Sequence, residues 1–97
     1  MSELKSYLLI FDNSQVSRES VIARIDAMPE IVNWSAFLPT GIAVVSDLDS
    51  KELARRVRDD RPSEFRFLLV PLSNATKNGW LPTNVWSFMN RPKRWDE

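Results

Sequence analysis

The chain has 97 residues, enough for one domain with a small core, and its 43% hydrophobic and 27% charged residues are ordinary for a globular protein. Thirteen basic residues balance thirteen acidic ones, so no strong overall field draws the chain to nucleic acid or to an anionic membrane. The absence of cysteine and histidine excludes disulfides, structural zinc, thiol nucleophiles and imidazole acid–base chemistry. Without a long apolar run or a signal-peptide pattern, we expect a cytoplasmic protein with no membrane segment.

The first part of the chain predicts a strand followed by a helix. Residues 6–12 form a short apolar run typical of a central strand. Ser17 is an N-cap residue, and apolar residues then recur at three- and four-residue spacing, which gives a helix one apolar stripe. Pro29 ends this helix, because proline restricts the residue before it.

A β-hairpin follows. Residues 31–38 alternate between apolar and polar side chains, as in a strand with one solvated face. Pro39 and Gly41 occupy the second and fourth positions of a tight turn, and residues 42–46 are the partner strand.

The remaining elements are a helix, a strand and a C-terminal attachment. Asp49 and Glu52 have the spacing of a capping box, which starts the second helix. Residues 65–72 form the last strand, with a proline near its end that favours an edge position. Residues 80–90 are rich in aromatic side chains and include a short helical turn.

The order strand, helix, strand, strand, helix, strand predicts an α+β fold, a ferredoxin-like βαββαβ sandwich. We expect a four-stranded antiparallel sheet of order 4-1-3-2, with two helices on one face and a C-terminal aromatic extension. Residues 1–90 then form a single domain, and residues 91–97 form a charged tail.

The first and last strands carry apolar side chains on both faces, whereas two helices cover only one face. Either the C-terminal aromatic segment folds across the other face, or a second copy of the chain packs there. A two-fold homodimer whose C-terminal segments clasp the partner satisfies both conditions. The residues expected at this interface are Tyr7, Leu9, Phe11, Phe65, Phe67, Trp80 and Trp86.

Asp12, at the end of the first strand, is the candidate catalytic and metal-binding residue. A carboxylate there could hold Mg²⁺, above all if a dimer axis brings two copies together. The alternative is that Asp12 ends the strand and bonds the polar loop after it. Asp47 and Asp49 follow an antiparallel strand and lie at the opposite end of the sheet, so one subunit does not assemble a two-carboxylate site.

Basic side chains on the second helix and in the tail are candidate contacts for nucleic acid, since they could bind phosphates. The alternative is a solvated surface with ion pairs, which the interspersed acidic residues favour. The candidates are Arg55, Arg58, Arg61, Lys93 and Arg94.

The run YLLIFD that ends at Asp12, the βαββαβ order and the closing patterns at residues 79–82 and 86–90 resemble the CRISPR-associated protein 2 superfamily of small ferredoxin-like proteins. That superfamily includes virulence-associated protein D-type toxins and uncharacterised short bacterial proteins, and the chain is most similar to the latter. The resemblance implies that Asp12 lies at a dimer interface, where the nuclease members associate this aspartate with a divalent metal. Residues 13–15 (Asn-Ser-Gln) differ from the aspartate- or arginine-rich turn of those nucleases.

These features predict a homodimeric module without a catalytic set or cofactor, which binds a protein partner or nucleic acid in phage defence or a toxin–antitoxin pair. The alternative is a Mg²⁺-dependent endonuclease of RNA or DNA that uses Asp12 from each subunit. A small-molecule sensor ranks third, because a chain with two glycines offers no glycine-rich ligand loop.

Overall fold

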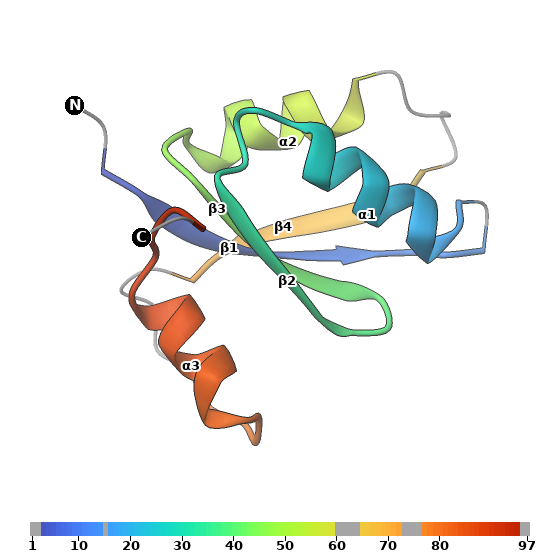
Figure 1. Cartoon of the computed structure of the whole chain (residues 1–97). Coiled ribbons are helices and arrows are strands. Elements are labelled where there is room, and N and C mark those ends of the chain that lie inside the picture. The colour runs from blue at the N-terminus through green and yellow to red at the C-terminus, as the bar shows by residue number, and fades with distance from the viewer. Residues whose placement is uncertain (1–2, 15, 60–64, 73–76, 96–97) are drawn as a thin grey trace.

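The computed structural model describes residues 3–14, 16–59, 65–72 and 77–95. They form an α+β fold with one four-stranded antiparallel sheet and three helices (Figure 1). In chain order the elements are β1 (Lys5–Phe11), α1 (Arg18–Ala27), β2 (Asn33–Leu38), β3 (Gly41–Ser46), α2 (Ser50–Arg58), β4 (Phe67–Pro71) and α3 (Thr83–Asn90).

The strand order in the sheet is β2-β3-β1-β4. Counted from the β4 edge, this is the order 4-1-3-2 expected from the sequence. The two central strands are β1 and β3, and each neighbouring pair of strands is antiparallel. In the middle of the sheet Leu9 of β1 lies opposite Ile42 on one side and Leu69 on the other.

The first two helices begin at the residues that the sequence indicates. The Ser17 side chain accepts a hydrogen bond from the Ser20 N–H at 3.1 Å, and Asp49 accepts one from the Glu52 N–H at 2.8 Å. Each bond satisfies one of the N–H groups that a helix leaves without a partner at its start. No helix in the described part of the chain is long and apolar enough to cross a membrane.

Helices α1 and α2 lie side by side on one face of the sheet (Figure 1). They bury a core of apolar side chains together with Tyr7, whose hydroxyl donates to the Leu48 carbonyl at 2.6 Å. Burial, and secondarily the charge of Asp49, raises the pKa of Tyr7. The fully buried side chains of this core include Leu9, Ile42 and Val44 from the sheet and Val21, Ile25, Leu53 and Val57 from the helices.

The opposite face carries α3, which is a helix of eight residues where the sequence predicts only a short helical turn. The expected number of two helices is therefore wrong. Val85 and Met89 of α3 are buried against Ala43 and Leu72. The Ser6 hydroxyl of β1 donates to the Met89 carbonyl at 2.6 Å and is buried. The C-terminal segment thus covers part of the second face.

The segment after α3 returns to the β2 edge of the sheet. The Asn33 side-chain amide donates to the Lys93 carbonyl at 3.2 Å, and the Trp95 N–H donates to the Val32 carbonyl at 3.1 Å. The predicted tail is therefore attached to β2 as far as Trp95.

Candidate functional site

A row of four apolar residues, one from each strand, crosses the second face of the sheet, and three of the four are exposed. Ile10 of β1 lies opposite Leu68 of β4 and Gly41 of β3, and Gly41 lies opposite Leu38 of β2. The exposed fractions are 42% for Ile10, 42% for Leu38 and 59% for Leu68. A Cβ atom on Gly41 would lie 3.2 Å from Leu38 Cδ1, so the Leu38 side chain lies close above the glycine. We call Leu38, Gly41, Ile10 and Leu68 the open row.

Helix α3 covers the other half of this face. The neighbouring row contains Val70, Leu8 and Ala43, of which Ala43 is fully buried and the other two are half-buried. Leu8 packs against the cluster that holds the buried side chains of α3. The second face therefore changes from covered to open along β1.

Trp80 precedes α3 and is 98% exposed. Trp86 lies within α3 and is partly buried against the cluster that contains Val85 and Met89. Figure 1 shows that α3 lies on the side of the sheet away from α1 and α2, with its first turn farther from the sheet than its last. An indole so fully in water is unusual, because a tryptophan buries about 150–250 Å² when it is enclosed.

Three residues expected at a subunit interface lie inside the chain instead. Tyr7, Leu9 and Phe11 face α1 and α2 and are 2%, 0% and 4% exposed. They offer no surface to a second copy, contrary to the sequence prediction. Both faces of β1 are apolar, so alternation alone could not show which face the helices cover.

The two predicted phenylalanines line a different surface. Phe65 is 8% exposed, and its ring is stacked on that of Phe67 with centroids 5.3 Å apart. Both contribute to a groove between β4 and α2 of about 1010 Å³. They therefore lie beside the helix-covered face, not in the open row.

Asp12 bonds the loop that follows β1. Its Oδ1 accepts the Ser14 N–H at 2.9 Å, and its own N–H donates to the Arg66 carbonyl at 2.9 Å. The hydrogen bonds from Ser14 lower the pKa of Asp12, and the charge of Arg66 adds to the effect. Within the described ranges of this single chain, no group of three or more acidic side chains is placed to hold a metal ion. This geometry matches the structural role for Asp12 that the sequence left open.

The predicted basic set is divided between the two edges of the sheet. Arg55 and Arg58 line the groove between α2 and β4. Lys93 and Arg94 follow α3, where Lys93 is bonded through its carbonyl to β2 at the other edge. Arg61 lies outside the described residues. The four of these cations that the structure describes do not form one continuous surface for nucleic acid.

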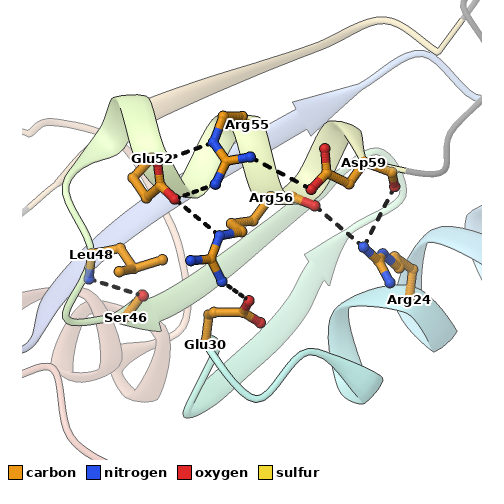
Figure 2. A network of polar contacts seen from close by, with 8 residues as sticks. All are labelled: Arg24, Glu30, Ser46, Leu48, Glu52, Arg55, Arg56 and Asp59. Atoms are coloured by element: carbon orange, nitrogen blue, oxygen red, sulfur yellow. Dashed lines mark hydrogen bonds and ion pairs between the residues drawn. The ribbon is translucent and has the colours of Figure 1, made fainter.

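Ion pairs hold part of α2 (Figure 2). Glu52 binds Arg55 at 2.6 Å and Arg56 at 3.0 Å, and Arg56 also pairs with Glu30, which follows α1. The hydrogen bonds from Arg55 and then Arg56 lower the pKa of Glu52 to about 2. Arg24 of α1 adds hydrogen bonds to carbonyls near the end of α2. For Arg55 and Arg56, the ion-pair interpretation of the sequence is therefore confirmed.

The groove between α2 and β4 was not expected from the sequence. Its α2 wall carries Lys51, Arg55 and Arg58 at three- and four-residue spacing, and its β4 wall carries Phe67 and Leu69. Four basic side chains line it against two carboxylates, so the groove is basic although the chain has no net charge. The helix spacing was visible in the sequence, but the position of β4 beside it was not.

No protein-family model matches the chain, and neither the curated proteins nor the solved structures contain a significant match.

Proposed function

We propose that this chain is a homodimeric binding module that associates through the open row. The observation that carries the proposal is the row itself, in which three exposed aliphatic side chains, from β1, β2 and β4, lie on one face of the sheet with Gly41 of β3 between two of them. A continuous apolar strip of this kind loses its contact with water when two sheets pack face to face.

The open row is too small to make a stable interface alone, because specific interfaces bury about 800 Å² on each partner. Trp80 supplies a large apolar side chain that is almost fully exposed. In the proposed dimer, α3 and Trp80 of one subunit lie against the open half of the partner's sheet. Because the dimer has a two-fold axis, α3 and Trp80 of the partner lie in the same way against the open half of the first subunit's sheet.

The finer classification belongs to this proposal. We assign the chain to the ferredoxin-like βαββαβ folds, to which α3 adds a C-terminal cover, and to the CRISPR-associated protein 2-like superfamily that its sequence resembles. The order of the elements and of the strands supports the first assignment.

Analytical ultracentrifugation of the purified chain at tens of micromolar tests the dimer. We expect a dimer for the native sequence and a monomer for Ile10→Lys and Leu68→Lys, because each places a charge in the apolar contact. Trp80→Ala should weaken the dimer without unfolding the subunit, since the Trp80 side chain is almost fully exposed within the subunit.

Ala23→Lys is the matched control, because Ala23 is exposed on α1, away from the second face. It should remain dimeric. A native chain that sediments as a monomer would contradict the proposal, as would a dimer that withstands both lysine substitutions in the open row. Thermal unfolding of each variant shows whether loss of the dimer reflects loss of the fold.

A further inference from the structure

The outer edge of β4 has backbone groups with no strand beside them among the described residues. The Asp12 N–H donates to the Arg66 carbonyl and the Leu72 N–H donates to the Ser6 carbonyl, so residues 66 and 72 turn their backbone groups toward β1. In an antiparallel ladder this orientation alternates. Phe67 and Leu69 therefore turn their N–H and C=O groups away from β1, and no described residue bonds them.

The position of Pro71 agrees with this phase. Pro71 is also an outward residue of β4. Proline has no N–H, and at an outward position the hydrogen bonds to β1 do not require one.

At the other edge of the sheet, the chain itself bonds two outward backbone groups of β2. The outward N–H of Trp34 donates to Asn33 Oδ1 at 3.0 Å, and the outward carbonyl of Ala36 accepts from Arg18 at 3.1 Å. A register shift between Ser35 and Leu38 further interrupts this strand. Only β4 thus offers, within the described part of the chain, a regular edge for another strand.

The side chains beside the β4 edge define what such a strand carries. On the α1/α2 face, the apolar side chains of Phe67 and Leu69 line the groove. Lys51 and Arg58 of α2 line it as well. Neither cation forms an ion pair with a described residue, whereas Arg55 is held by Glu52. On the opposite face, Leu68 and Val70 are exposed and half-exposed.

We propose that β4 binds an extended peptide of alternating acidic and apolar residues, which adds to the sheet as a fifth strand. The peptide's glutamates lie on the groove side, where their methylene groups cover Phe67 and Leu69 and their carboxylates reach Lys51 and Arg58. Its apolar residues extend the surface of Leu68 and Val70. Main-chain hydrogen bonds to Phe67 and Leu69 supply affinity, and the two faces supply specificity.

The charge of the groove favours this occupant over a second copy of the chain. Two β4 edges that paired would bring two basic groove walls together, and like charges across an interface oppose association. A nucleic acid strand would use the cations but not the alternating N–H and C=O groups of the edge. An acidic peptide uses both.

Two measurements with a fluorescent peptide of eight alternating valine and glutamate residues test the proposal. Anisotropy should show binding to the native chain, and an otherwise identical valine–lysine peptide should not bind. Hydrogen exchange followed by NMR should show that the Phe67 and Leu69 amides become protected when the acidic peptide is added. Absence of binding at millimolar peptide, or binding without protection of these two amides, would overturn the proposal.

Leu69→Pro and Leu69→Ala separate the backbone from the side chain. Both remove the leucine side chain, but only proline removes the outward N–H. We expect the proline variant to bind at least about tenfold more weakly than the alanine variant, which corresponds to one lost hydrogen bond. Equal affinities of two folded variants would overturn strand addition.

A charge-reversal pair tests the groove wall. Arg58→Glu should weaken binding of the acidic peptide, whereas Lys93→Glu at the opposite edge should leave it unchanged. A fluorescent oligothymidine measured in parallel distinguishes the rival occupant: tighter binding of the oligonucleotide than of the peptide, lost in Arg58→Glu but retained in Leu69→Pro, would overturn the peptide assignment. These tests do not depend on dimerisation, because the Ile10→Lys variant keeps the β4 edge and should bind the acidic peptide equally well.

Discussion

Ser6 joins β1 to α3 through a buried hydrogen bond. Its hydroxyl, fully buried on the second face, donates to the carbonyl of Met89 in the last turn of α3. Carbonyls in the last turn of a helix have no partner within the helix unless a cap or another element supplies one. One small side chain thus attaches the helix that covers half of the second face.

We predict that Ser6→Ala lowers the free energy of unfolding by about 1–2 kcal/mol, because the Met89 carbonyl keeps its burial and loses this donor. Urea unfolding followed by tryptophan fluorescence measures the change. Ser87→Ala in the exposed part of α3 is the control and should change stability by less than about 0.5 kcal/mol. Equal effects of the two substitutions would show that the Ser6 bond does not stabilise the fold.

At the scale of elements, α2 is held through its charged residues as well as its apolar ones. Leu53 and Val57 are buried in the core, while Glu52 binds two arginines of the same helix. Arg56 extends the contact to Glu30, so the network joins α2 to the residues that follow α1 (Figure 2).

The low pKa of Glu52, about 2, predicts a pH dependence of stability. The folded state holds this carboxylate in its charged form, so its contribution is complete above the ordinary pKa of 4.5 and is lost as the pH falls toward 2. The free energy of unfolding should therefore fall more steeply between pH 4.5 and 2 in the native chain than in Glu52→Gln. Urea titrations at several pH values measure both slopes.

Salt provides the control for this prediction. Glu52 lies at the surface, so sodium chloride at about 1 M should screen its ion pairs and reduce the difference between the two slopes. A difference that persists unchanged in high salt would point to a cause other than these ion pairs.

Some elements could be predicted because their signals are local, and others could not. Ser17 and Asp49 cap their helices through neighbours three residues away, and both positions were readable from the sequence. Helix α3 has no side-chain cap bond at its N-terminus and is held by the packing of Val85 and Met89 against the sheet. Isolated helices this short are unstable, so its extent depends on tertiary contacts that the sequence does not display.

The same distinction applies to the candidate sites. The sequence indicated that β1 has two apolar faces, but placed the interface on the side of Tyr7, which the helices of the same chain cover. The open row depends on the register that brings Ile10 opposite Gly41 and Leu68. The groove beside β4 depends on which helix packs near that edge. Neither relation follows from residues close in sequence.

In the whole molecule, helices cover one face of the sheet more completely than the other. Two helices enclose one face, and one helix leaves the open row on the other exposed (Figure 1). If dimerisation covers that row, folding and association are linked. Only folded subunits can form the dimer, so a higher protein concentration stabilises the folded state.

We predict that the melting temperature of the native chain rises with protein concentration over about a hundredfold range. The melting temperature of Ile10→Lys should stay constant over the same range, because its subunits remain separate. Scanning calorimetry or circular dichroism measures both. A native melting temperature independent of concentration would argue against a dimer linked to folding.

The unequal edges of the sheet also bear on uncontrolled polymerisation. Fibrils built from stacked strands require that every added unit present a fresh edge to the next. In this chain β2 has its outward Trp34 N–H and Ala36 carbonyl already bonded within the chain, so a copy that docked on β4 through β2 would find these two groups occupied. With the register shift of β2, these bonds make the β2 edge a poor template, so the addition of one strand at β4 does not favour growth of a fibre.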